Sequence, residues 1–230
     1  MKSRVLVLAV LLLPLAASRA AGQRIESPYR FVENSQAAGA YAAMLWPAEG
    51  RLGLGPQSAP GLGLRYGIAL SGPLTVELDL LYAPTTRSVG DTVLTVPDSL
   101  PTVLGEADMG LVVAMGSVRF NITGGRTWRG LQPFALFGAG LVTDIAGRSA
   151  LADSLPAAAR VNFGTKFAGQ LGAGVEVHPS TRWSLRVDAR NAIWKLEYPP
   201  AFRTSQGSRT VPADEWESNT IVSVGLALRF

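Results

Sequence analysis

The chain has 230 residues, of which 47% are hydrophobic and 17% are charged, and its formal net charge is +4. This length fits one domain, and disorder over most of the chain is excluded because apolar side chains are plentiful and charge is low. The lack of cysteine excludes disulfides, a lipid-modified cysteine and cysteine-based catalytic or metal sites, and a single histidine excludes a histidine-rich metal site. No cofactor or metal is therefore expected.

Residues 1–20 have the composition of a secretory signal peptide. Lys2 and Arg4 give a positive start, residues 5–17 form an apolar core, and residues 18–20 include the small side chains that a signal peptidase reads. The core is shorter than the roughly 20 residues of a membrane-spanning helix, which argues against a permanent anchor. Cleavage would remove three basic residues and no acidic one and leave a net charge of about +1, so the positive charge does not indicate nucleic-acid binding.

Residues 21–37 are expected to form a periplasmic N-terminal segment, and β-strands are predicted beyond them. In residues 74–82 every even position is apolar, whereas Glu77 and Asp79 lie at odd positions. Because a strand points alternate side chains to opposite faces, this strand has one apolar face and one face with two carboxylates. The same period of two recurs in residues 61–70, 183–190 and 222–230.

Eight strands are predicted, and most exceed the roughly 9–11 residues with which a tilted strand crosses a bilayer. Long and short links alternate between them, as in a barrel with short periplasmic turns and long external loops. The sequence therefore predicts an all-β fold, a closed antiparallel up-and-down transmembrane β-barrel of eight strands. The strands are 38–46, 60–70, 73–86, 108–121, 131–145, 163–178, 183–197 and 218–230; the long links are 47–59, 87–107, 146–162 and 198–217, and the short links are 71–72, 121–130 and 179–182.

Two features of this assignment stay open. Residues 93–96 are apolar enough to extend a hairpin into the 87–107 link. Aromatic residues near the strand ends are expected at the two membrane–water interfaces, although an aromatic core in a soluble β-protein is the alternative. We expect Phe120, Phe134, Trp183 and Phe230 at the periplasmic interface and Trp46, Tyr82, Trp194, Tyr198 and Trp216 at the outer interface.

Two segments carry a family resemblance. Residues 172–176 read Gly-Ala-Gly-Val-Glu and are followed, after a short turn, by Trp183-Ser-Leu-Arg-Val-Asp188. This resembles the hairpin of the sixth and seventh strands in small OmpA-type outer-membrane barrels, where a G-x-G-x-E strand precedes an aromatic-x-x-R-x-D/E strand. The alternating apolar strand that ends in Leu226, Leu228 and Phe230 resembles the C-terminal assembly signal of that family.

The resemblance implies an eight-stranded barrel in the bacterial outer membrane, exported behind a cleaved signal peptide. It also implies insertion by periplasmic chaperones and the outer-membrane assembly machinery, with outer-membrane lipid and lipopolysaccharide as the surroundings. OmpA itself carries a peptidoglycan-binding domain after its barrel. This sequence shows no counterpart of that domain, so the resemblance gives no ground for inferring anchoring to the cell wall.

The predicted register turns nine charged side chains toward the barrel lumen. A lumen of eight strands has room for side chains and little room for solvent, so isolated charges there would be very costly. We expect a structural network of ion pairs, and a gated narrow pore or proton path is the alternative. The nine residues are Arg65, Glu77, Asp79, Arg119, Glu176, Arg186, Asp188, Arg190 and Arg229.

Other motifs carry weaker signals. Some outer-membrane deacylases of lipid A use a His-x-Ser pair with a carboxylate, and His178-Pro179-Ser180 lies close to Glu176. The segment falls at a predicted periplasmic turn, however, whereas lipid A lies in the outer leaflet, so ordinary turn chemistry is favoured. The Gly-x-Gly repeats open no predicted helix after a buried strand and are not expected to bind a dinucleotide.

The sequence thus predicts a non-enzymatic integral outer-membrane barrel that contributes to envelope structure or presents loops for surface interactions. The links 87–107 and 198–217 mix charges of both signs with proline or tryptophan, which suits an exposed surface. Three different functions stay open beside it: a lipid A-modifying enzyme, a narrow passive channel and a soluble periplasmic barrel that binds a small ligand.

Overall fold

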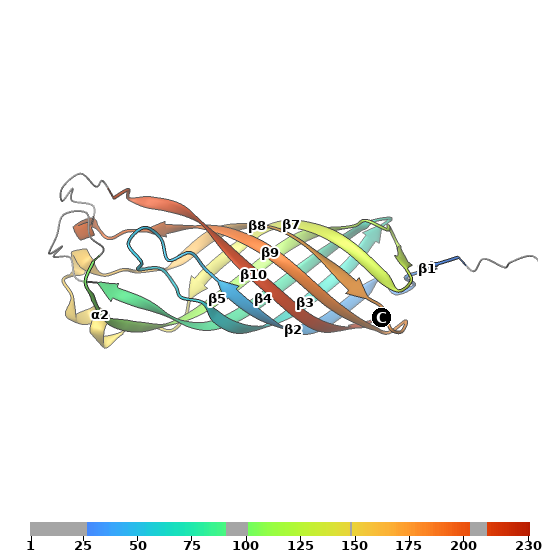
Figure 1. Ribbon diagram of the computed structural model, residues 1–230, viewed down its shortest axis with the longest axis horizontal. Coiled ribbons are helices and arrows are strands. Elements are labelled where there is room, and N and C mark those ends of the chain that lie inside the picture. The colour runs from blue at the N-terminus through green and yellow to red at the C-terminus, as the bar shows by residue number, and fades with distance from the viewer. Residues whose placement is uncertain (1–26, 91–100, 148, 203–210) are drawn as a thin grey trace, which may run out of the picture.

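Eight long β-strands form a closed ring in the computed structural model, which describes residues 27–90, 101–147, 149–202 and 211–230 (Figure 1). Each strand pairs antiparallel with its neighbour along the chain, which confirms the predicted up-and-down barrel. The strands are β2 (Gln36–Trp46), β3 (Ala59–Ser71), β4 (Leu74–Gly90), β5 (Val103–Asn121), β7 (Leu131–Asp144), β8 (Thr165–Val177), β9 (Trp183–Glu197) and β10 (Asp214–Arg229).

The ring closes where β10 pairs with β2, over ten residue pairs from Thr220↔Trp46 to Arg229↔Ala37. Gln36 and Phe230 continue this pairing by exchanging two backbone hydrogen bonds of 3.0 and 3.1 Å. Closure removes the free edges that an open sheet would expose, which is the condition for a sheet to lie in lipid. In the described part of the chain, no helix has the length and apolarity needed to cross a bilayer.

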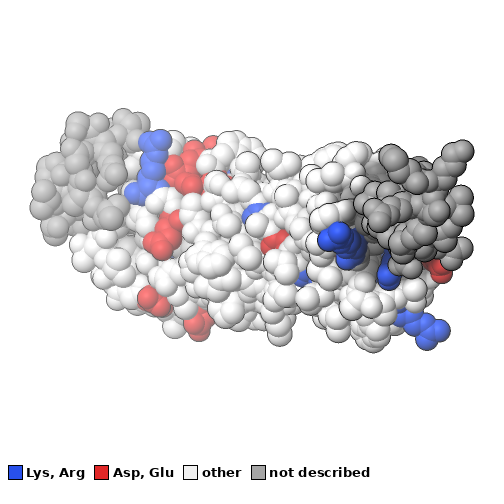
Figure 2. All heavy atoms as spheres, turned by 45° about the vertical axis from the view of Figure 1, so that its right-hand side comes forward, with Lys and Arg blue, Asp and Glu red and all other residues white. Residues whose placement is uncertain are grey.

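Alternation along each strand separates an apolar exterior from a mixed interior. On β4 the side chains of Leu78 and Leu80 are exposed on the outer surface, whereas Glu77 and Asp79 are buried inside. The outward rows of neighbouring strands are apolar and join into a band around the middle of the barrel. This part of the surface is largely white in Figure 2, with only a few charged atoms visible between the apolar side chains. Soluble proteins rarely expose so large an apolar surface, so this band fits a lipid environment.

The interior has two halves of different chemistry. The half near the short turns holds charged side chains, which are described below. The half near the long links is filled by an apolar cluster that includes Trp194 and receives side chains from seven of the eight ring strands. Its other large members are Leu45, Leu81, Met109, Leu111, Val113, Met115, Val142, Phe163, Leu196 and Ile221.

Among the described residues, three short helical segments lie in the long links at one end of the barrel (Figure 1). They are α2 (Ala150–Ser154), η1 (Ala157–Ala159) and η2 (Pro200–Phe202). A second apolar cluster ties these links together across the mouth of the barrel, above the apolar half of the interior. Its buried members are Leu52, Leu54, Ala159, Tyr198 and Phe202.

A small ribbon at the opposite end was not predicted. In it β1 (Tyr29–Phe31) pairs antiparallel with β6 (Arg126–Trp128), and β6 joins the start of β7 through the pair Trp128↔Leu131. Strands of three residues are too short to produce a recognisable period of two, and the first lies in the segment expected to be a periplasmic extension. The division between that extension and the barrel stays a prediction.

Several predicted strand bounds are too short. The pairing of β4 and β5 continues from Arg87↔Ala107 to Gly90↔Val103, so the ends of the 87–107 link do extend the hairpin. Residues 93–96, which suggested that extension, lie outside the described residues. The last strand begins at Asp214 instead of residue 218, because it stays paired with β9 beyond the lipid-facing alternation.

The prediction of interfacial aromatics was wrong for three residues. Phe134, Trp194 and Tyr198 are 1%, 0% and 3% exposed and point into the barrel or its outer mouth. A position near a strand end does not determine on which face of the strand a side chain lies. Phe134 and Trp194 occupy inward-facing positions of β7 and β9, and Tyr198 continues the alternation of β9. The other six are exposed, as expected: Trp46, Tyr82, Phe120, Trp183, Trp216 and Phe230.

Candidate functional site

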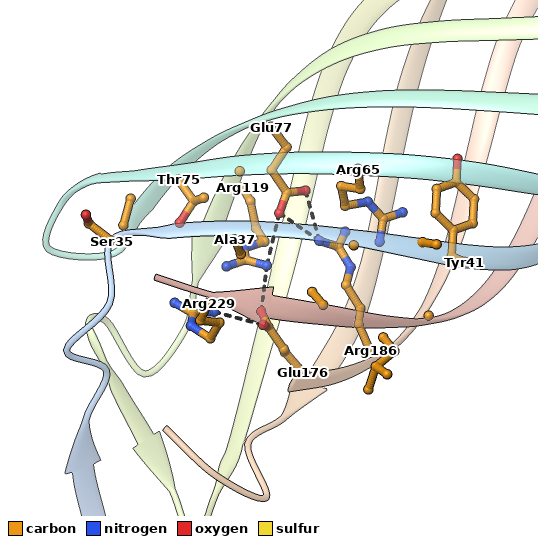
Figure 3. A pocket seen from close by; sticks show the side chains of 17 residues that line it. Ser35, Ala37, Tyr41, Arg65, Thr75, Glu77, Arg119, Glu176, Arg186 and Arg229 are labelled. Atoms are coloured by element: carbon orange, nitrogen blue, oxygen red, sulfur yellow. Dashed lines mark hydrogen bonds and ion pairs between the residues drawn. The ribbon is translucent and has the colours of Figure 1, made fainter. Parts of the chain in front are cut away.

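The charged half of the lumen brings together all nine side chains that alternation placed there. Each forms at least one ion pair with another member of the set, and the carboxylates come from β4, β8 and β9. Figure 3 shows the part of the network around Glu77 and Glu176. Eight of the nine residues are buried, and the side chain of Arg65 is only slightly more accessible. The network therefore links strands on opposite sides of the ring through its interior.

The part of the network closest to the short turns is built around two glutamates. Glu77 accepts a hydrogen bond of 2.7 Å from Arg186 Nη1 and forms an ion pair of 3.0 Å with Arg119 Nη1. Glu176 accepts from Arg119 Nη1 at 2.7 Å and from Arg229 Nη1 at 2.9 Å. Arg119 on β5 thus bridges the two carboxylates, and Arg229 joins the last strand to them (Figure 3). Charge-assisted bonds of this length are among the strong ones in proteins.

The middle part of the network is built around two aspartates. Asp79 accepts from Arg65 Nε and from Arg190 Nη1, both at 2.9 Å. Asp188 forms ion pairs with Arg190 Nε at 3.0 Å and with Arg65 Nη1 at 3.2 Å. Arg186 Nε connects this part to the glutamates through a 2.9 Å contact with Asp188. Each buried charge therefore has an opposite charge beside it, as burial in a narrow lumen demands.

Two lumen aromatics complete the network, and the sequence reasoning missed both. Tyr41 on β2 donates its hydroxyl to Asp79 at 2.5 Å and lies under the guanidinium of Arg65, 4.6 Å from its ring centroid. Phe134 on β7 lies under Arg186, with the guanidinium 4.2 Å from the centroid. Stacking on a ring face stabilises a cation. Phe134 lies two positions after the polar Gln132 on β7, so alternation places both side chains on the inward face, and this was the signal that could have identified it.

The arrangement leaves little free space. The cavity lined by the network has a volume of about 40 Å³, with Thr75, Arg119 and Arg229 toward the end with the short turns (Figure 3). A water molecule needs roughly 10–15 Å³ of such volume, so a few waters fit and a solute does not. The described residues include no group of three or more histidine, aspartate or glutamate side chains that could hold a metal. The chemistry of this half is ion pairing within the protein.

A second polar cluster lies at the rim with the long links, beyond the apolar band. The Arg51 amide donates to Tyr198 Oη and to Glu215 Oε1, each at 2.8 Å, and Arg51 Nε lies 3.1 Å from Glu215 Oε2. Burial raises the pKa of Tyr198, and its hydrogen bond to Glu215 acts in the same direction. Burial also raises the pKa of Glu215, but hydrogen bonds from Tyr198 and Arg51 outweigh it and leave the pKa below its usual value. These contacts fasten the first long link to β10.

The His178-Pro179-Ser180 segment forms a turn between β8 and β9, as favoured from the sequence. The His178 ring contacts Gln132 Oε1 at 3.3 Å, and Ser180 Oγ accepts a hydrogen bond of 3.0 Å from the Trp183 amide. The Glu176 carboxylate is engaged by Arg119 and Arg229. Each member of the hypothetical triad therefore has a structural partner of its own.

The residues expected to form an assembly signal lie on the outer surface of β10. Leu226 and Leu228 are exposed in the same outward row as Val222 and Val224, and Phe230 follows the strand in that row. This placement puts them in contact with the surroundings of the barrel. Their recognition by assembly machinery stays a prediction.

Comparison with known proteins gives one family match. The family model described as "Outer membrane protein beta-barrel domain" matches residues 5–230. Among solved structures, the chain is similar to Neisserial surface protein A, with 13% identity, a TM-score of 0.48, and coverage of 89% of this chain and 98% of that one. It is also similar to OprG from Pseudomonas aeruginosa, with 15% identity, a TM-score of 0.49, and coverage of 86% and 96%. It is similar as well to the E. coli outer membrane protein W, with 14% identity, a TM-score of 0.45, and coverage of 86% of this chain and 98% of that one. No curated protein matches the chain.

Removal of one carboxylate from the lumen should destabilise the barrel strongly. Glu77→Gln leaves the charges of Arg186 and Arg119 without their shared counter-ion in a buried site, and loss of one partner of a buried pair costs about 3–5 kcal/mol. The exposed pair between Lys195 and Asp214, 3.3 Å apart, provides the control. Asp214→Asn should cost less than about 1 kcal/mol. Denaturant unfolding in detergent micelles measures both, and equal midpoints for the two variants would contradict this assignment.

Proposed function

The chain belongs to the outer membrane protein β-barrel family, and on that premise we propose that it is a closed, non-enzymatic barrel of the bacterial outer membrane. It contributes a rigid, lipid-embedded cylinder to the envelope and presents its long links at the cell surface. The observation that carries the proposal is the filled interior. Ion pairs occupy one half of the lumen and apolar side chains occupy the other.

The two halves oppose passage of ions in different ways. In the charged half, each guanidinium and carboxylate is held by contacts of 2.7–3.2 Å, which leaves a cavity of about 40 Å³. In the apolar half, packed side chains such as Trp194 and Leu111 offer no polar partner to a hydrated ion. Because the two barriers lie in series along the barrel, opening the ion network alone leaves the apolar half closed. This supports a barrel without a channel function.

The same packing argues against a soluble ligand-binding barrel and against a lipid A-modifying enzyme. A soluble ligand-binding barrel needs a hydrophilic exterior and an interior cavity, whereas here the exterior is apolar and the interior is occupied. An enzyme that modifies lipid A through a serine needs a base beside that serine at the outer leaflet. The Ser180 hydroxyl lies at the end with the short turns and accepts from the Trp183 amide. We therefore place the function in the surface of the barrel and not in its lumen.

The route to the membrane is part of the proposal. Residues 1–20 act as a cleaved signal peptide, and periplasmic chaperones and the outer-membrane assembly machinery deliver and insert the barrel. The exposed apolar row of β10 that includes Leu226, Leu228 and Phe230 supports recognition of this strand during insertion. Outer-membrane lipid surrounds the apolar band, and lipopolysaccharide faces the links at the outer end.

The proposed closed state predicts an absence of ion conduction. Purified protein in planar lipid bilayers should give no conductance steps. The double variant Glu77→Ala/Arg186→Ala, which opens the ion network, should remain silent because the apolar half is unchanged. Steps from the unmodified protein would contradict a closed barrel. Steps from the double variant alone would show that the ion network is the barrier.

The proposed orientation can be tested with single cysteines, because the natural chain has none. Ser154→Cys lies in α2 at the end with the long links, and Thr181→Cys lies in the turn between β8 and β9. A membrane-impermeant maleimide should label Ser154→Cys in intact cells and Thr181→Cys only after the outer membrane is permeabilised. Both side chains are exposed, so accessibility within the protein is matched. The reverse pattern of labelling would show that the barrel has the opposite orientation in the membrane.

A further inference from the structure

The ribbon of β1 and β6 presents an aromatic face at the end of the barrel with the short turns (Figure 1). The pairs Tyr29↔Trp128 and Phe31↔Arg126 place these four side chains on one face, and Arg30 and Thr127 on the other. Trp128 also pairs with Leu131, which has the outward parity of β7 because Gln132 and Phe134 are buried inside. At Trp128 the aromatic face therefore adjoins the outer, lipid-facing surface of the barrel, and Tyr29, Phe31 and Arg126 also border a recess of about 610 Å³ at the mouth of the lumen.

The three rings on this face are exposed although they are large. Phe31 is 70% exposed, and Tyr29 and Trp128 are also exposed. Phe120, Trp183 and Phe230 are exposed at the same end of the barrel, so the ribbon extends an interfacial aromatic belt. The rings thus lie at the end of the barrel where the apolar band meets the short turns.

Two arginines on this face differ from the arginines of the lumen. Arg126 lies over the Phe31 ring, 4.4 Å from its centroid, and Arg129 lies over the Trp128 ring at 5.5 Å. Neither forms an ion pair with a carboxylate of the described residues, whereas each lumen arginine does. A cation over a ring face is stabilised by the ring, and a guanidinium without a carboxylate partner keeps its N–H donors available for hydrogen bonds. Both cations are therefore positioned for an external anion.

The backbone of Arg129 has an unusual conformation. It is the one described non-glycine residue with a positive φ, 50°, and Gly130 follows with φ of 82°. A two-residue hairpin turn of this kind favours Asn-Gly, because a side chain with a Cβ is strained in the left-handed region. Arginine at this point accepts that strain while placing its guanidinium over Trp128.

The charge of the whole end agrees with an anionic partner. Outside the ring strands, the described residues here include four arginines and one acidic residue, Glu33. Figure 2 shows Lys and Arg at the right-hand end of the barrel and most Asp and Glu toward the opposite end. The basic residues are Arg30, Arg126, Arg129 and Arg182.

We propose that the outer face of the β1–β6 ribbon is a binding site for anionic phospholipid headgroups of the periplasmic leaflet. Arg126 and Arg129 bind the phosphate groups through their guanidinium N–H donors, and Tyr29, Phe31 and Trp128 lie against the glycerol and upper acyl region. Guanidinium groups match phosphate oxygens in paired hydrogen bonds, and interfacial aromatics favour this depth. The continuity of the face with the apolar band selects a lipid as the occupant over a periplasmic protein.

Native mass spectrometry of the folded barrel in detergent tests this site, with phosphatidylglycerol and phosphatidylcholine as the two probes. The unmodified barrel should bind phosphatidylglycerol in preference to phosphatidylcholine. Arg126→Gln/Arg129→Gln should lower the affinity for phosphatidylglycerol by at least about fivefold, because each basic residue near an anionic surface strengthens binding to that surface. Arg182→Gln is the matched control, because it removes an exposed arginine from the same end that stacks on no described ring. It should bind phosphatidylglycerol almost as the unmodified barrel does.

A second measurement places the lipid at the ribbon itself. In vesicles, brominated phosphatidylglycerol should quench the fluorescence of Trp128, read as the difference between the unmodified barrel and Trp128→Phe, more than brominated phosphatidylcholine does. Heat-modifiable gel migration of all variants shows that the barrel is folded. Equal binding of the two lipids, or an equal loss in Arg182→Gln, would overturn the proposal. So would unchanged binding in the folded double variant.

Discussion

The structure depends on the pairing of every strand in a closed ring. An unpaired backbone N–H or C=O group costs roughly several kcal/mol in hydrocarbon. A sheet can therefore lie in a membrane only when its first and last strands pair with each other, as β2 and β10 do here. Closure with eight strands fixes a narrow lumen. The narrow lumen in turn requires that charged side chains pair and that apolar side chains pack, and both conditions are met along the barrel axis.

These conditions divide the molecule into regions with different roles. The ion network and the apolar cluster occupy the interior, where their contacts link the strands of the ring. The surfaces left for interaction lie at the two ends. At the outer end, contacts such as that of Arg51 with Glu215 hold the long links over the mouth. At the other end, Arg126 and Arg129 have rings beneath them and no carboxylate of the described chain beside them.

Much of the fold followed from the period of two. Alternation of Glu77 and Asp79 with outward leucines identified both the lipid-facing band and the acids of the lumen, because one register sets both faces of a strand. Aromatic rings were harder to place: Phe134 and Trp194 fill the interior, while Trp183 is exposed. A barrel accepts rings on either face, so strand position alone cannot decide. The β1–β6 ribbon was missed because pairs of three-residue strands depend on tertiary contacts more than on local pattern.

The most direct test of the closed ring is a disulfide across its seam. Ala43 on β2 is paired with Ser223 on β10, and both are small and point inward. Because the chain has no other cysteine, oxidation of Ala43→Cys/Ser223→Cys in membranes should give one intramolecular bond, read as a mobility shift on a denaturing gel. Ala43→Cys/Ala227→Cys, displaced by four residues or roughly 13 Å along the strand, should give none. Cross-linking of the displaced pair, or none in the paired positions, would contradict the closed barrel.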